Sequence, residues 1–201
     1  MLVALLVQDS DSATAIMKDA ARKLEHAQSI QYVEDRFNEE FRKGVRTSYW
    51  YRSGGYFRAE SPTITDISNP RQGWTFRKDK KIYQARPSVG PEFKIAARLG
   101  LEFFGPNFPV IGESQSVIWH KMTALRVELD GRKQMTKETK LFVYFDPKTH
   151  LPVGISANLG SLTQVTMFEN LKLGAAIPAS IFSFSPPKGW KKVTAESGGW
   201  K

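Results

Sequence analysis

The most regular alternation of hydrophobic and polar positions lies in the C-terminal third of the chain. Residues 141–145 are β-branched or aromatic, and the sequence D-P-K-T that follows has the composition of a tight turn. From residue 153 to residue 160, apolar residues alternate with small or polar ones, which is the period of a strand with one apolar face. A third strand is predicted over residues 163–168. This region therefore predicts consecutive antiparallel strands joined by short turns.

One amphipathic helix is predicted near the N-terminus, over residues 12–27. Its apolar positions recur at intervals of three and four residues, and Ser10 or Ser12 can cap its first turn. These positions are Ala13, Ile16, Met17, Ala20, Leu24 and Ala27. The stripe can pack into the core or face a ligand on the open side of a curved sheet, and the pattern leaves both open.

The stretch between these two regions predicts a meander of short strands. Residues 29–42 fit a helical stripe almost as well as a long strand, and Tyr32 with the β-branched Val33 favours the strand. Further strands are predicted over residues 47–52, 56–60, 63–67, 73–77, 81–85, 116–121 and 123–130. Residues 91–104 lack strand alternation and predict short helical turns in a crossover, which the breaker at 105–109 separates from the sheet.

The pattern ends in a C-terminal hook, residues 177–190, where a short strand is predicted to stop at two prolines. Its sequence P-x-S-x-F-x-F-x-P-P-x-G, with the strands before it, resembles the C-terminal half of the LolA-like envelope proteins, the outer-membrane lipoprotein carriers and their relatives. Upstream, residues 51–60 resemble a hairpin of that family, and residues 74–76 resemble one of its strands. Ser53 and Ala59 depart from it, since the family usually has Pro and often has Trp there.

Strand pattern and resemblance together imply a mainly β (α+β) fold. We expect a strongly curved antiparallel sheet that forms an incomplete barrel, with short helices covering its open, concave side. At 201 residues the chain suits one domain. This domain is expected over residues 10–201, after an apolar terminus or signal-peptide remnant at residues 1–9.

The predicted binding site is an apolar cavity on this sheet. Thirteen Phe, five Trp and six Tyr offer more aromatic surface than one short helix covers, and a groove for acyl chains needs burial area and few directed polar groups. The side chains expected to line this cavity are Trp50, Phe57, Trp74, Phe76, Val153, Ile155 and Ala157, and all of them except Phe57 are expected on one apolar face. Ordinary core packing is the alternative for any one of them.

Arg52 is the predicted gate of this cavity. By resemblance it matches the family arginine that hydrogen-bonds to the backbone of the lid helices and keeps the cavity closed. If Ser48 and Trp50 face inward, the Arg52 guanidinium lies at the rim, where its five donors can reach unpaired carbonyls at helix ends. The alternative is a surface arginine at the mouth of a hairpin.

The charge of the chain favours acidic partners. The net charge is +9, with basic clusters at residues 77–81, 132–133 and 191–192. Lysines at turns and sheet edges also serve solubility and prevent edge pairing. A basic nucleic-acid-binding β protein is therefore a distant alternative, and its affinity would fall steeply with salt, whereas burial of acyl chains would hardly weaken.

The sequence contains no recognisable catalytic motif. His26, His120 and His150 are too scattered for a metal site, and the absence of cysteine excludes disulfides, thiolate zinc sites and a Cys nucleophile. No phosphate-binding loop follows a strand. We therefore expect no enzymatic activity, no cofactor and no metal.

The resemblance implies a non-catalytic periplasmic carrier, exported with its signal peptide truncated in this sequence. It would bind the acyl chains of a lipoprotein or lipid as a monomer, with transient membrane-associated donor and acceptor proteins as partners and without nucleic acid. The alternative within the same fold is a regulatory lipid or lipoprotein sensor that docks onto a membrane-bound partner.

Overall fold

The computed structural model describes residues 12–40, 44–92, 99, 108–130, 140–159 and 161–194. Within these residues the chain forms one sheet of twelve strands, in the order β12-β6-β5-β4-β3-β2-β1-β11-β10-β9-β8-β7. Neighbouring strands pair antiparallel, except that β12 and β6 are parallel. The elements are α1 (Ala13–Glu25), β1 (Ser29–Asn38), β2 (Gly44–Arg52), β3 (Tyr56–Glu60), β4 (Ile64–Ser68), β5 (Gly73–Arg77), β6 (Ile82–Arg86), β7 (Val110–Trp119), β8 (Met122–Asp130), β9 (Lys140–Phe145), β10 (Pro152–Leu159), β11 (Leu162–Leu173), the 3-10 helix η3 (Ala179–Phe182) and β12 (Lys191–Lys192).

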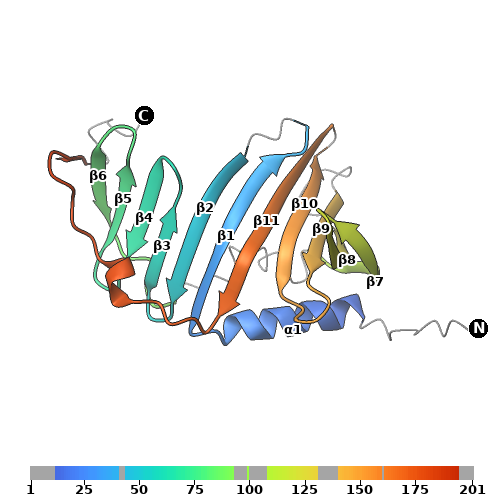
Figure 1. Ribbon diagram of the computed structural model, residues 1–201. Coiled ribbons are helices and arrows are strands. Elements are labelled where there is room, and N and C mark those ends of the chain that lie inside the picture. Colours follow the sequence, from blue (N-terminus) through green and yellow to red (C-terminus); the bar gives the residue numbers. More distant parts are fainter. Residues whose placement is uncertain are drawn as a thin grey trace, which may run out of the picture.

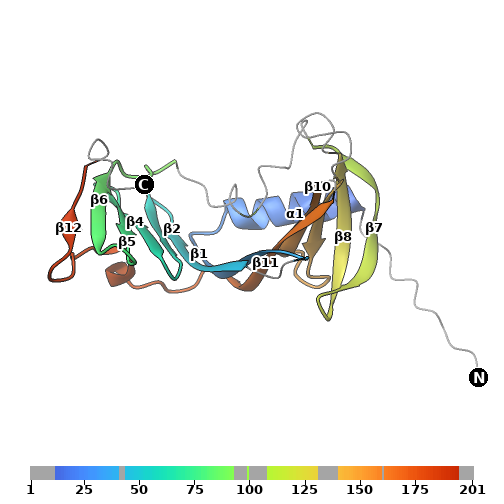
Figure 2. The ribbon, with the colours of Figure 1, turned by 90° about the horizontal axis from the view of Figure 1, so that it is seen from above.

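The sheet is strongly curved and open (Figure 1), with β7 at one end and β12 at the other (Figure 2). Seen from above, α1 lies inside the curve, on the concave face, and the C-terminal hook runs along the convex face beside β3 to β6 (Figure 2). The predicted fold class, a curved antiparallel sheet that forms an incomplete barrel, is therefore confirmed.

The helix α1 forms where the apolar stripe predicts it. The Ser12 side chain caps it by accepting a hydrogen bond from the backbone N–H of Ala15 at 3.2 Å. The stripe itself is buried, at Ala13, Ile16, Met17, Ala20 and Leu24. Its first turns pack with residues of β8 and β9 such as Val127 and Val143, and its last turn packs with Ile30 of β1. One helix thus covers the middle of the concave face.

The strand register separates the two faces of the sheet. Residues that pair directly across antiparallel strands have their side chains on the same face. Tyr49 pairs with Tyr32 and Ala59, and all three are buried in the cluster under the end of α1. The next residue, Trp50, pairs with Arg58, and the two side chains lie on the convex face.

Several predicted boundaries differ from the structure. The strand predicted from residue 116 begins at Val110, and the strand predicted over residues 163–168 continues to Leu173. The short strand predicted in the C-terminal hook is wrong, because Ala179–Phe182 form a 3-10 turn after Pro178 instead. The N–H of Ile181 donates to the carbonyl of Pro178 at 3.1 Å, a local bond that replaces strand pairing. Most of the crossover predicted over 91–104 lies outside the described residues.

Two phenylalanines fix the C-terminal hook to the convex face. Phe182 is 1% exposed, and its ring lies 5.5 Å from that of Tyr56. The Phe184 ring lies 4.5 Å from that of Phe76. Arg58 adds a polar bond by donating from Nη1 to the carbonyl of Ile181 at 3.1 Å. The C-terminal hook therefore covers apolar surface that α1, on the other face, cannot reach.

Phe182→Ala should destabilise the protein by about 3 kcal/mol or more, since it removes a fully buried aromatic side chain. Urea unfolding followed by circular dichroism measures this loss. The neighbouring exposed residue provides the control, Ser183→Ala, which should change the free energy of unfolding by less than about 0.5 kcal/mol. A loss as small for Phe182→Ala would mean that the C-terminal hook contributes little to the core.

The turn between β9 and β10 has a fixed shape. Asp146 Oδ1 accepts hydrogen bonds from the backbone N–H groups of Lys148 and Thr149, at 3.0 and 2.7 Å. The N–H of Asp146 donates to the carbonyl of Leu151 at 3.0 Å and closes the loop. The D-P-K-T sequence therefore forms the predicted turn, and this turn presents a rigid surface to α1.

Polar contacts hold α1 against this turn. The carboxylate of Asp19 accepts a hydrogen bond from Lys23 Nζ at 2.6 Å and lies 3.0 Å from His150 Nδ1. Lys23 Nζ also donates to the carbonyl of Thr149 at 2.7 Å. Hydrogen bonds from Lys23, Arg22 and His150 hold the pKa of the Asp19 carboxyl well below its usual range. The helix is thus attached to the sheet by charge as well as by its apolar stripe.

Asp19→Asn should destabilise the protein at neutral pH and much less in acid. A carboxyl with a lowered folded-state pKa contributes stability above its unfolded pKa of about 4, and this contribution is lost as the pH falls. Thermal unfolding of wild type and variant across this range should show the two midpoints converging. The exposed Glu25 on the same helix gives the control, since Glu25→Gln should leave the gap to wild type small at every pH. A gap for Asp19→Asn that does not change with pH would contradict the charged anchor.

Candidate functional site

An apolar groove lies on the concave face between α1 and the start of β7. Its volume is about 410 Å³, within the range of pockets that hold small ligands. Residues from one side of the helix and from the segment that leads into β7 line it: Thr14, Met17, Lys18, Ala21, Phe108, Pro109 and Val110. The carbonyl of Pro109 accepts a hydrogen bond from the N–H of Asp130 at 2.8 Å, which ties this wall to β8.

The chemistry of the groove suits an apolar ligand. Met17, Ala21, Phe108 and Val110 present carbon and sulfur surface, and the flexible thioether of Met17 can adapt to an irregular shape. Lys18 is exposed, so its ammonium can meet an anionic group while its methylenes extend the apolar wall. Among the described residues, the lining holds no carboxylate and no histidine. Such a lining favours binding by burial of hydrocarbon over acid–base chemistry.

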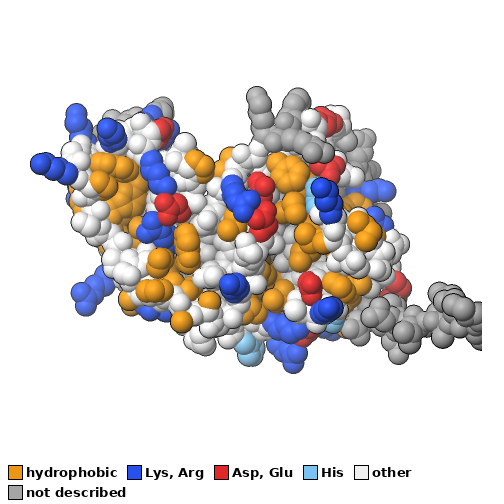
Figure 3. Space-filling model, viewed as in Figure 1, with side chains coloured by type: hydrophobic (Ala, Val, Ile, Leu, Met, Phe, Trp, Pro, Cys, Tyr) orange, Lys and Arg blue, Asp and Glu red, His pale blue; other side chains and the backbone are white. Residues whose placement is uncertain are grey.

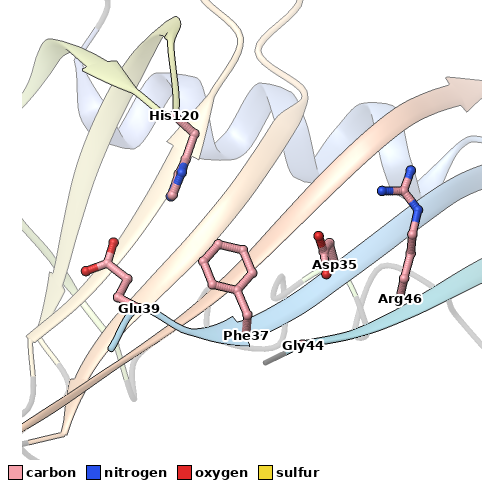
Figure 4. A pocket seen from close by; sticks show the side chains of 6 residues that line it. All are labelled: Asp35, Phe37, Glu39, Gly44, Arg46 and His120. Atoms are coloured by element: carbon pink, nitrogen blue, oxygen red, sulfur yellow. The ribbon is translucent and has the colours of Figure 1, made fainter. Parts of the chain in front are cut away.

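A second cavity, on the convex face, has a different character. It measures about 600 Å³ and is lined by Asp35, Phe37, Glu39, Gly44, Arg46 and His120. His120 comes from the turn between β7 and β8 and lies across from the side chains of β1 and β2 (Figure 4). Arg46 is paired with Glu169 at 2.5 Å, and two carboxylates share the lining with it. This polar lining is unsuited to a hydrocarbon chain.

A third cavity, of about 280 Å³, lies between the C-terminal hook and β3 to β5. Phe76, Phe184 and Trp190 form its apolar walls. Its charged groups satisfy one another, since Glu60 accepts hydrogen bonds from Arg58 at 2.7 Å and from Lys78 at 2.8 Å. This cavity is smaller than the groove beside α1 and lies on the opposite face.

The described parts of the chain contain no group of three or more His, Asp or Glu side chains placed to hold a metal ion. Their one α-helix, α1, is too short and too polar to cross a membrane.

The structure divides the seven predicted cavity residues between the two faces. Phe57, Ile155 and Ala157 belong to the clusters on the concave face, under α1. Trp50, Trp74, Phe76 and Val153 lie on the convex face. The expectation of a single shared face is therefore wrong. For Val153 the reason is a bulge next to Pro152, which shifts its alternation relative to Ile155.

Arg52 lies on the convex face as well, not at the rim of a concave cavity. Its guanidinium stacks 3.9 Å from the centre of the Tyr56 ring and 5.5 Å from that of Phe182. Ser48 and Trp50 share this face, so the assumption that they point inward is incorrect. A gate role for Arg52 toward residues 93–98 and 100–107, outside the described part of the chain, stays a prediction.

The groove residues were only partly predictable. Met17 belongs to the helical stripe, for which a ligand-facing role was one of two alternatives, and Ala21 lies one position beside that stripe. The sequence predicted a breaker at Phe108 and no strand at Val110, because Pro106 and Pro109 favour an irregular segment. In the structure β7 begins at Val110, directly after Pro109. The adjacent β-branched residues Val110 and Ile111 are the signal that could have predicted a strand beginning at residue 110 instead of 116.

Comparison with known proteins places the fold. The sequence matches no model of a known protein family, and no curated protein sequence matches it. Among solved structures, an uncharacterized conserved protein from Thermus thermophilus matches with a TM-score of 0.57 and 10% sequence identity, covering 90% of this chain and 98% of that chain. The architecture is therefore shared over nearly the whole length of both proteins.

Two further solved structures, with lower TM-scores, are of named proteins or superfamilies. The lipoprotein LppX of Mycobacterium tuberculosis matches with a TM-score of 0.48 and 9% identity, covering 83% of this chain and 97% of that chain. A LolA superfamily protein from Nitrosomonas europaea matches with a TM-score of 0.39 and 11% identity, covering 87% and 99%. At these identities the likeness concerns the fold, and function has to be argued from the site.

Proposed function

We infer that this protein is a non-catalytic carrier that holds an acyl chain of a lipoprotein or lipid in the groove beside α1. The observation that carries this proposal is the pairing of a 410 Å³ apolar groove with a single exposed cation, Lys18, among its lining residues. A hydrocarbon chain buried between Met17 and Phe108 gains about 0.8 kcal/mol per methylene, without any directed polar contact. An anionic head group can remain near Lys18 in water.

The open sheet supports a carrier in particular. Among the described residues, the concave face of this twelve-stranded sheet is covered by the single helix α1, which packs on β1, β8 and β9. The described cover is therefore narrow compared with the sheet. A ligand that enters beside α1 can therefore leave by the same route, as delivery between membrane-associated donor and acceptor proteins requires. We place this activity in the periplasm because the sequence resembles the LolA-like envelope proteins, and a protein without cysteines is compatible with that compartment.

Filling the groove should block binding. Ala21→Phe adds an aromatic ring on the groove side of α1, and the loss of two buried methylenes at about 0.8 kcal/mol each lowers affinity by about tenfold or more. Titration with a fluorescent fatty acid measures this change. The matched control is Ala15→Phe, the same substitution on the same helix at an exposed position outside the groove, which should bind like wild type.

Three outcomes separate the possibilities. Weaker binding by Ala21→Phe alone supports the groove. Equal affinities for wild type and both variants, all folded by circular dichroism, would show that the groove does not bind the fatty acid. Loss of binding in Ile155→Asp but not in Ala21→Phe would instead indicate that the ligand binds deeper in the concave face, between the two buried clusters that Ile155 contacts. Mass spectrometry of lipids that co-purify with the protein then identifies the ligand.

A further inference from the structure

An aromatic patch lies on the convex face, on the side of the sheet opposite to α1. We use this name for Trp74, Phe76, Tyr83, Phe184 and Trp190. The Phe184 ring is at its centre, 5.2 Å from Trp74, 4.5 Å from Phe76 and 5.3 Å from Tyr83. All of these side chains except Phe76 are only half-buried, so a substantial part of their ring surface meets solvent.

Positive charge surrounds this patch. The turn between β5 and β6 and the segment from the C-terminal hook into β12 carry the basic residues Arg77, Lys78, Lys80, Lys81, Lys188, Lys191 and Lys192, with Asp79 as the only acidic residue in these two stretches. They are brought together because β12 pairs with β6, and the N–H of Lys191 donates to the carbonyl of Lys81 at 3.1 Å. Figure 3 shows the resulting surface, a hydrophobic area on the left lobe with Lys and Arg side chains around it.

Much of this charge is not neutralised within the protein. Arg77 pairs with Asp79 at 2.8 Å, and Lys78 pairs with Glu60. The ammonium groups of Lys81, Lys191 and Lys192 are exposed, and the described residues offer them no ion pair. Lys81 lies in the turn before β6, and Lys191 and Lys192 lie on β12, which pairs with β6 at the end of the sheet. Lys192 pairs with Tyr83 and shares the face of the patch, while Lys191 pairs with Ile82, so the three charges together give this end of the sheet a positive potential.

We propose that the aromatic patch and its lysine rim form a docking surface for an anionic lipid bilayer. Tryptophan and tyrosine side chains favour the interface between hydrocarbon and water, because their rings are apolar and their polar atoms stay hydrated. Lysines around them reach the phosphate groups of lipids while their methylenes lie along apolar surface. The 280 Å³ cavity between the C-terminal hook and β5 offers space for part of a lipid head group or chain beside Trp190.

This surface goes beyond the proposed function and does not rest on it. The acyl groove lies beside α1 on the concave face, while the patch lies on the convex face of β5 and β6. Figure 2 shows α1 and the C-terminal hook on opposite sides of the sheet. A protein docked through the patch therefore keeps its groove away from the bilayer surface. Edge lysines that only prevent strand pairing would need no aromatic neighbours, and loss of Trp190 would then leave vesicle binding unchanged.

Co-sedimentation with vesicles tests the proposal. Wild type should bind vesicles made of equal amounts of phosphatidylcholine and phosphatidylglycerol, and it should not bind phosphatidylcholine alone. Replacing Lys81, Lys191 and Lys192 together by Gln should weaken binding by about a hundredfold, from the contribution of each lysine near a charged membrane. Trp190→Ala should weaken binding also at high salt, where screening removes most of the charge contribution.

A second triple variant provides the control. Lys140, Lys148 and Lys172 are exposed on β9, on the turn after it and on β11, and their replacement by Gln removes the same charge elsewhere. This variant should sediment like wild type, and equal losses in both triple variants would show an effect of net charge alone and overturn the patch. Binding of wild type to polyglutamate but not to anionic vesicles would contradict docking on a bilayer and would indicate an acidic protein partner. Ala21→Phe should still bind vesicles, which separates a failure of the groove from a failure of this surface.

Discussion

The alternation of side chains along a β-strand is the constraint on which the rest of the structure depends. In β9, Leu141, Val143 and Phe145 are buried on the concave face, whereas Tyr144 is buried on the other side, stacked on Trp119 at 4.2 Å between ring centres. Such a strand has apolar side chains on both faces. A sheet built this way is stable only when each face has its own cover.

The chain meets this need with two different covers. The helix α1 covers the concave face with its apolar stripe and is attached through Asp19, near its middle, and Lys23, in its last turn, to the turn after β9. The C-terminal hook covers part of the convex face with Phe182 and Phe184, and Arg58 bonds to its backbone. Each cover combines an apolar contact with a charged anchor, so each has a defined position on its face.

Within the described residues neither cover reaches across its whole face, and we place the proposed ligand site and docking surface on the parts that these residues leave open. The groove left between α1 and β7 is apolar and suits a hydrocarbon chain, while the surface left around the C-terminal hook is aromatic with a basic rim. The helix α1 lies inside the curve of the sheet and the C-terminal hook lies outside it (Figure 2), so the proposed ligand site and the proposed docking surface face in different directions.

The sequence by itself determined the local structure. The helical stripe with Ser12 before it, the D-P-K-T turn and the β-branched and aromatic runs depend on contacts between near neighbours, and these elements appear within a few residues of their predicted bounds. Tertiary structure alone decided which face each residue occupies. A period of two places Trp50 and Tyr49 on opposite faces, but both faces are covered with apolar groups, so composition cannot say which is concave. In the same way Gly154 reads as a polar-face position, yet a Cβ there would lie 1.9 Å from a ring atom of Trp119, a residue far away in the chain. Packing between distant segments sets such contacts, and no local pattern contains them.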